Sequence, residues 1–180
     1  MEQQKVSWVF EPSHCKLGFS VRHFGISETE GLFGKFTGSI SRGEKINFSD
    51  AGVDLTVDVA SIDTRDKTRD AHLLSADFLN VEKFPAIHFK STGTEVIGKD
   101  HYRMLGNLTM MGITKPISLD VEFGGIIEKD PFGNTKAGFF VTGKINRKDW
   151  GITWNAALDQ GGVAVSETVK ISCHIELLRT

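Results

Sequence analysis

Apolar and polar residues alternate with a period of two over most of this chain. The clearest segment is residues 53–59, where three valines and a leucine alternate with two aspartates and a threonine. Successive side chains of a β-strand point to opposite faces, so this pattern is typical of a strand with one dry face and one wet face. The alternation predicts eight strands, at residues 17–21, 32–40, 53–59, 87–89, 102–110, 117–123, 139–145 and 169–177.

The segments between these strands contain the residues that favour turns. Examples are Asp50-Ala51-Gly52, Gly98-Lys99-Asp100 and Asp130-Pro131-Phe132-Gly133-Asn134, whose glycines, proline and asparagine supply the dihedral angles that chain reversals need. We therefore expect antiparallel hairpins.

One stretch, residues 64–79, breaks the alternation and has helical spacing over 66–74. It predicts a short helix after the third strand. Ser75 to Leu79 is expected to form a second helical turn capped by Ser75.

Eight strands that each have a dry face predict an all-β fold, because an open sheet would leave that face and two edges in water. The pattern leaves a barrel and a sandwich open. An eight-stranded barrel is just wide enough to be filled by side chains or to hold one small ligand. The pattern therefore leaves a packed interior and a ligand cavity open as well.

The bulk composition limits the partners. At 180 residues with 39% hydrophobic content, one domain over 1–180 is expected. A net charge of −2 offers no basic surplus, so we expect no nucleic-acid partner, and no apolar run is long enough to predict stable membrane insertion. The first residues do not resemble a signal peptide, which predicts a cytoplasmic protein as written, or a periplasmic or secreted one if a leader has been removed.

The sequence contains none of the short motifs that mark common enzymes. HExxH, GxSxG and a phosphate-binding loop are missing, and the six histidines have no metal-ligand spacing, so we expect no catalysis, no cofactor and no metal. A metal site built in space from His14, His23 and His72 is the alternative. Cys15 and Cys173 are interpreted as small apolar fillers, with a disulfide as the alternative if the first and last strands pair.

Several blocks of sequence resemble the YceI-like family of lipid-binding proteins. They include Ser61-Ile62-Asp63-Thr64, Arg69-Asp70-Ala71-His72-Leu73, Phe84-Pro85, and the longer blocks 8–14, 19–23, 106–116 and 146–151. The resemblance implies a lipocalin-like barrel of eight antiparallel strands with a helical insertion. It also implies that a polyisoprenoid or another long-chain amphiphile binds inside the barrel, often in a homodimer. Many relatives are periplasmic or secreted, and this chain departs from them in lacking a leader.

The candidate ligand-binding residues come from the dry phase of the strands, with a tryptophan near the opening. They are Leu17, Phe19, Val21, His23, Leu32, Phe36, Leu55, Val57, Phe89, Met104, Leu108, Met110, Leu119, Phe139, Val141 and Trp154. His23 ends its strand in that phase, where it would hydrogen-bond a head group, although a surface histidine near a turn is the alternative. Trp150 and Trp154 are expected to line the opening or to cover it.

The charged residues of the family-like blocks are given structural roles. Arg69, Asp70 and His72 are expected to anchor the short helix to the barrel rather than to perform chemistry, and Arg147 and Asp149 to lock a turn as a pair. The predicted function is to bind and carry, or store, an isoprenoid quinone or polyprenyl lipid. The alternatives are a fatty acid or fatty amide as ligand, or a ligand-free barrel that binds a partner protein.

Overall fold

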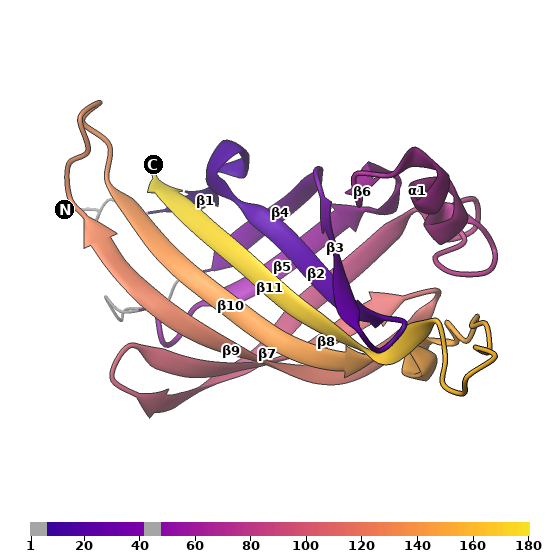
Figure 1. The fold of residues 1–180 in the computed structure, drawn as a ribbon. Helices are drawn as coiled ribbons and strands as arrows, with labels where there is room; N and C mark the ends of the chain where they lie inside the picture. The colour runs from indigo at the N-terminus through magenta and orange to yellow at the C-terminus, as the bar shows by residue number, and fades with distance from the viewer. Residues whose placement is uncertain (1–6, 42–47) are drawn as a thin grey trace.

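The computed structural model describes residues 7–41 and 48–180, and these residues form one antiparallel sheet with a single α-helix (Figure 1). The strands are β1 (Trp8–Phe10), β2 (Lys16–His23), β3 (Ser27–Phe33), β4 (Phe36–Ser41), β5 (Gly52–Asp58), β6 (Ile62–Asp63), β7 (Ala86–Gly98), β8 (His101–Met110), β9 (Ile113–Ile127), β10 (Lys136–Asn146) and β11 (Val165–Arg179). The helix α1 covers Lys67–Leu74, and three 3₁₀ turns, η1 (Pro12–His14), η2 (Val59–Ser61) and η3 (Arg147–Trp150), connect strands.

The strands follow the order β4-β5-β7-β8-β9-β10-β11-β2-β3-β6, and β1 pairs with β11 outside this order. Every pairing is antiparallel, and the long strands curl around a common axis (Figure 1). The all-β class and the helix after the third predicted strand are therefore confirmed.

The strand count is eleven rather than eight among the described residues, chiefly because the predicted strand 32–40 is two strands. The chain breaks at Gly34 and Lys35, whose backbone N–H groups donate to the carbonyl oxygen and to Oγ of Ser61. The described residues form no ladder between β3 and β4, so hydrogen bonds do not close the sheet into the complete ring that we expected. The ring of Phe10, on β1, packs edge-on against Phe36, on β4, at 5.6 Å between centroids.

Helix α1 begins after Asp66, whose side chain accepts a hydrogen bond from the N–H of Arg69 at 3.0 Å. Ser75 ends this helix, and its hydroxyl donates to the carbonyl of His72 at 2.6 Å. The predicted second helical turn over residues 75–79 is wrong, because the backbone there forms a series of tight turns. The N–H of Leu79 returns to the carbonyl of Leu73, which folds this segment back against the helix.

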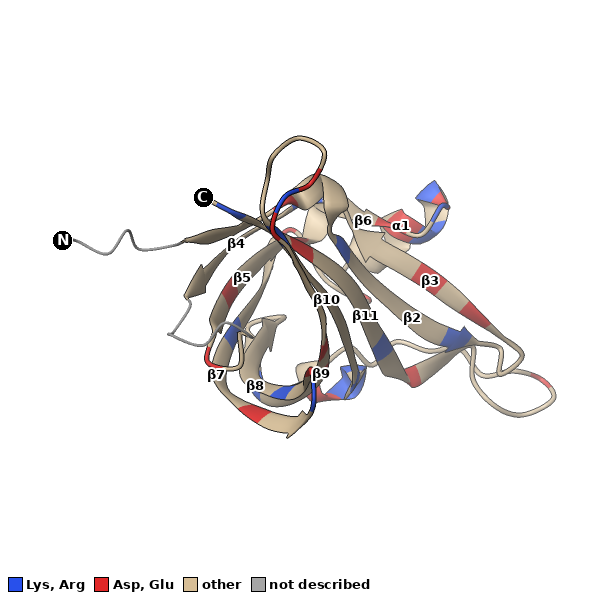
Figure 2. Ribbon diagram, turned by 90° about the vertical axis from the view of Figure 1, so that its left-hand side faces the viewer, with Lys and Arg blue, Asp and Glu red and all other residues tan. Residues whose placement is uncertain are grey.

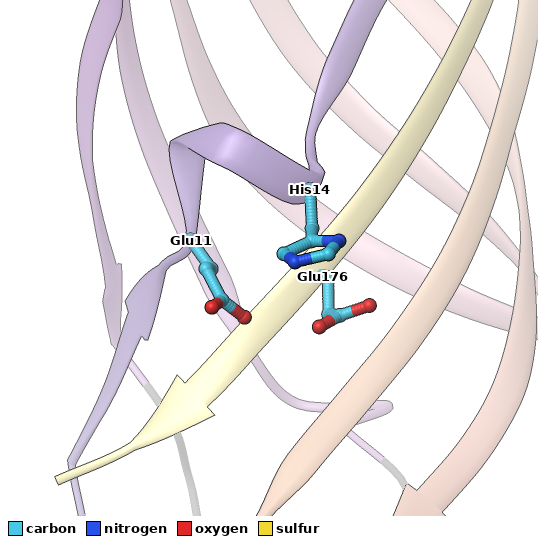
Figure 3. Close-up of side chains that lie close together, drawn as sticks. All are labelled: Glu11, His14 and Glu176. Carbon is cyan, nitrogen blue, oxygen red and sulfur yellow. The ribbon is translucent and has the colours of Figure 1, made fainter. Parts of the chain in front are cut away.

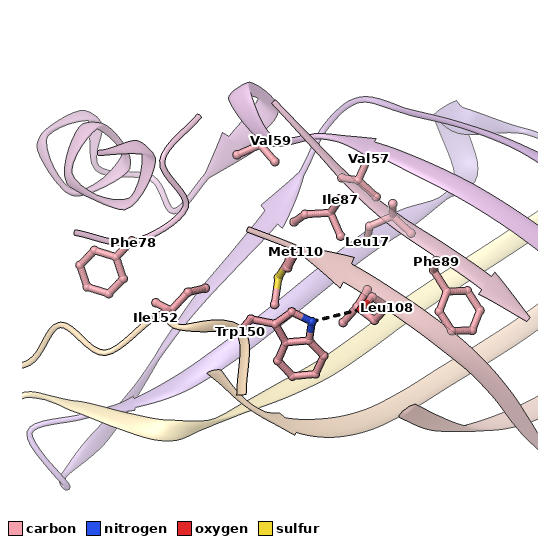
Figure 4. Close-up of a cluster of buried hydrophobic side chains, with 10 residues drawn as sticks. All are labelled: Leu17, Val57, Val59, Phe78, Ile87, Phe89, Leu108, Met110, Trp150 and Ile152. Atoms are coloured by element: carbon pink, nitrogen blue, oxygen red, sulfur yellow. Dashed lines mark hydrogen bonds between the residues drawn. The ribbon is translucent and has the colours of Figure 1, made fainter. Parts of the chain in front are cut away.

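Two apolar clusters lie inside the curl of the sheet. The larger one contains Trp150, Leu108, Met110 and Phe78, and it packs beside α1 (Figure 4). The smaller one brings together Trp8, Phe48, Ala137 and Leu177. Because β11 runs from Val165, near α1, to Leu177, the two clusters lie toward opposite ends of the sheet.

Basic and acidic residues are interspersed on the strands, and neither sign forms a continuous face in Figure 2. Within the described residues, no helix has the length and apolar character needed to cross a bilayer.

Candidate ligand-binding cavity

The inward face of the sheet encloses a cavity of about 650 Å³. Apolar side chains of β2, β5, β7, β8, β9, β10 and β11 form most of its wall, and α1 with the segment 152–165 covers one end. Ligand pockets of ~300–1,000 Å³ are typical of small-molecule sites. The interior is therefore hollow rather than packed solid.

The cavity wall contains every residue of the predicted ligand-binding set except Leu32 and Phe36. Alternation placed these residues correctly because a strand in a curled sheet turns the same parity inward along its whole regular length. That they contact a ligand stays a prediction.

Leu32 is excluded because the sequence phase was wrong in β3. Its neighbours Gly31 and Phe33 point inward, since Phe33 lines the cavity and a Cβ on Gly31 would lie 2.4 Å from the ring of Phe19. Leu32 thus faces outward. The break at Gly34 and Lys35 shifts the alternation, so a single phase cannot hold from Leu32 to Ile40.

Phe36 has the predicted phase but does not reach the cavity. It pairs directly with Val57, a wall residue, and directly opposed residues of an antiparallel pair share a face. Its ring is instead occupied by Phe10 and the surrounding core.

Strand β11 supplies wall residues that the prediction omitted. Val169, Ile171, Cys173, Ile175 and Leu177 all line the cavity. Their alternation was visible in the sequence, so the signal was present and was not used. From Val165 to Leu177 the strand extends about 40 Å at ~3.3 Å per residue, which makes the cavity long.

An aromatic cluster lies at the end of the cavity remote from α1. The ring of Phe48 lies 5.1 Å from the rings of Trp8 and Phe139 and 5.9 Å from that of Phe123. Phe48 and Phe139 line the cavity there. Phe48 belongs to no predicted strand, so alternation offered no signal for it.

Polar wall residues gather at the α1 end. His23 lines the cavity and stacks on Phe24, with 3.7 Å between ring centroids. His72 and Trp154 also line it, with 4.8 Å between their rings. Trp154 is thus part of the wall, whereas Trp150 is almost fully buried outside it and donates from Nε1 to the carbonyl of Leu108 at 3.1 Å (Figure 4).

The predicted pairing of Arg147 with Asp149 is wrong. Arg147 is 3% exposed, lines the cavity and donates to the carbonyls of Ser166, Ile152 and Val165. Asp149 is exposed. The guanidinium therefore fastens η3 to the segment that leads into β11 through backbone oxygens, without a carboxylate.

Thr64 joins the α1 motif to the sheet. Its N–H and hydroxyl both donate to Oδ1 of Asp70, at 2.9 and 2.6 Å, and Arg69 donates to the Thr64 hydroxyl and carbonyl oxygens at 2.8 and 2.6 Å. These contacts agree with the expected anchoring role. Arg69 and His72 also line the cavity, so their role is not purely that of anchors.

A second group of ionisable residues lies outside the cavity. Glu11, His14 and Glu176 place potential ligand atoms within 4.8 Å of one another (Figure 3). This is the group with metal-ligand spacing among the described residues, and it differs from the trio of His14, His23 and His72 considered above.

The ammonium of Lys136 already neutralises this group. It lies 2.8 Å from both Glu11 and Glu176 and 3.7 Å from Asp130. Hydrogen bonds to Glu11 and Glu176 raise the pKa of Lys136, and the hydrogen bond from Lys136 lowers the pKa of Glu176. The arrangement is therefore an ion network that ties β10 to β11 and to the segment after β1.

Both cysteines are free thiols, although β2 and β11 do pair. The Sγ of Cys15 donates to the carbonyl of Glu176 at 3.4 Å, and Cys173 faces the cavity. Burial raises the pKa of the Cys173 thiol to about 11, so it is protonated and unreactive at neutral pH.

A curled antiparallel sheet around one long apolar cavity defines a lipocalin-like container protein. The chain belongs to the YceI-like domain family, whose model matches residues 8–177. A UPF0312 protein from Staphylococcus aureus strain N315 is 33% identical over 170 residues, which cover 94% of this chain and 96% of that protein.

Two solved structures extend the comparison. A Campylobacter jejuni YceI protein is 31% identical with a TM-score of 0.73, covering 87% of this chain and 88% of its own. A polyisoprenoid binding domain from Saccharophagus degradans shares the fold, with a TM-score of 0.71 at 12% identity over 98% of this chain and all of that domain.

Proposed function

We propose that this protein binds a long-chain amphiphile, most favourably a polyisoprenoid, and carries or stores it without catalysis. The observation that carries the proposal is the cavity of about 650 Å³ with its apolar wall. Family membership and the Saccharophagus degradans domain, which is described as polyisoprenoid-binding, support the ligand class.

The tail of such a ligand supplies most of the affinity. Burying one methylene contributes ~0.8 kcal/mol, whereas a neutral head-group hydrogen bond contributes only ~0.5–1.5 kcal/mol. At ~30 Å³ for each water-sized group, a cavity of about 650 Å³ accommodates roughly 20 non-hydrogen atoms. A tail of about four isoprene units fills it, and a longer tail extends through the opening.

A chain-length series tests this proposal. Geraniol, farnesol and geranylgeraniol contain two, three and four isoprene units, and each competes with a fluorescent lipid for the cavity. We expect affinity to rise steeply at each step and to level off beyond four units. Unbranched alcohols of equal carbon number separate isoprenoid from fatty-chain preference. Affinity that does not change with chain length contradicts tail burial in the cavity.

A further inference from the structure

The ionisable residues of the cavity wall are all basic or neutral. Arg69, Arg147, His23 and His72 line the cavity, and no aspartate or glutamate of the described residues does. The remaining wall is apolar apart from hydroxyl and thiol groups. A hollow that presents two guanidinium groups and no carboxylate has a positive electrostatic bias.

These basic residues lie at the α1 end of the cavity. Arg147 donates to the carbonyl of Val165, and Val165 is the strand partner of His23. His72, three residues after Arg69 on α1, contacts Trp154 of the segment that follows Arg147. The opposite end is formed by the aromatic cluster around Phe48, so the cavity has a cationic end and an apolar end.

The charge of Arg147 is buried without an ionic partner. The described residues place three carbonyl oxygens against it and no carboxylate within ion-pair distance. The nearby Glu167 is paired with Lys148 at 2.5 Å. A guanidinium has five N–H donors, so three carbonyls leave donors unused, and burial of an uncompensated charge is costly. An anion in the cavity relieves that cost.

Arg69 is in a similar state. Its hydrogen bonds go to the neutral oxygens of Thr64, while Asp70 accepts from Thr64 rather than from Arg69. Asp77 is the acid that faces this end, and its carboxylate lies 2.9 Å from Nε2 of His72. Both guanidinium groups thus retain their charge toward the cavity end.

We propose that the cavity selects amphiphiles with an anionic head group, a carboxylate or a phosphate, held at the α1 end by Arg147 and Arg69. This inference rests on the proposed function and adds the chemistry of the head group. The tail then extends toward the aromatic cluster at Phe48.

A head-group series on one tail tests the inference. Oleic acid and oleyl phosphate are compared with oleyl alcohol and oleamide in displacing a neutral fluorescent probe at neutral pH. We expect the anionic compounds to bind about tenfold or more tightly, because a hydrogen bond to a charged group contributes more than a neutral one. The two anionic arms distinguish a carboxylate from a phosphate.

Two variants assign the selectivity. Arg69→Gln and Arg147→Gln are expected to lose the preference for anions while they bind oleyl alcohol as before. Arg103→Gln is the matched control, since Arg103 is exposed and pairs with Glu95 and Asp120 away from the cavity wall. If Arg147→Gln does not fold, Arg69→Gln and the wild-type series still decide.

Equal affinity for the charged and neutral compounds in the wild-type protein overturns the anionic preference. That outcome leaves the proposed function standing. Failure of all four lipids to displace the probe contradicts the proposed function itself, so the two failures are distinguishable.

Discussion

Single glycines shape the cavity wall. A Cβ on Gly31 would lie 2.4 Å from the ring of Phe19, and one on Gly106 would lie 2.4 Å from the ring of Phe89. Both rings belong to the cavity wall. The glycines therefore let two phenylalanine rings lie against the sheet instead of filling the interior, which helps to keep it hollow.

The inward phase of β8 can be tested with two adjacent substitutions. Leu108→Asp places a carboxylate on the cavity wall and is expected to abolish lipid uptake, since an unpaired charge in apolar surroundings is costly. Phe19→Asp should act in the same way. Asn107→Asp, one residue away on the exposed face, is expected to bind normally.

The measurement is lipid displacement on variants whose folding has been verified by circular dichroism. Normal uptake by a folded Leu108→Asp protein contradicts the assignment of this residue to the cavity wall.

At the level of elements, α1 depends on one buried carboxylate. Asp70 is 5% exposed, and Oδ1 accepts both hydrogen-bond donors of Thr64. Asp70→Ala removes that acceptor and leaves the buried N–H of Thr64 unpaired, which costs about 1–3 kcal/mol of unfolding free energy. We expect faster proteolysis within residues 64–80 and a lower denaturant midpoint.

Asp77→Ala is the control, because Asp77 is exposed and contacts His72 at the surface. It should leave both measurements nearly unchanged. Equal protease sensitivity of Asp70→Ala and the wild type would show that Thr64 does not depend on this carboxylate.

Regular strands were the elements that the sequence predicted well. The walls of β5, β8, β9 and β10 followed from parity alone, because each strand keeps one face inward along its regular course. Parity failed where the chain bends, as between Phe33 and Phe36, since a break resets which face is inward.

Cavity residues outside the regular strands were also missed as ligand-binding candidates. Arg147 and His72 approach the cavity from η3 and α1, and Phe48 approaches from a turn. Their positions depend on contacts between distant segments, such as that of Arg147 with Val165. Such contacts have no local sequence period, so the cationic end of the site was not predictable from alternation.

For the whole molecule, we expect stability to fall in acid. The hydrogen bond from Lys136 lowers the pKa of Glu176, and the hydrogen bond from Lys170 lowers that of Glu28. Backbone N–H donors likewise lower the pKa of Asp66 and Asp130. A carboxyl with a depressed folded pKa stabilises the fold above its unfolded pKa of ~4, and this stabilisation is lost as pH falls through the folded pKa.

Thermal unfolding between pH 7 and pH 3 should therefore show a midpoint that decreases below about pH 4. Lys136→Met is expected to lower the midpoint at pH 7 and to flatten its decrease in acid. Lys90→Met is the control, since Lys90 is exposed and lies 3.7 Å from a single acid, Asp54. If the two variants behave alike, the ion network around Lys136 does not contribute to stability.

The whole architecture is a sheet wrapped around a long apolar hollow, and the account depends on that hollow taking up lipid. Native mass spectrometry of the protein purified from its natural host, followed by lipid extraction, measures this directly. The account predicts a bound long-chain lipid that raises the mass of the intact protein and is recovered in the organic phase. A protein that is isolated without lipid, and that also fails to bind added isoprenoid quinones or fatty acids, would contradict it.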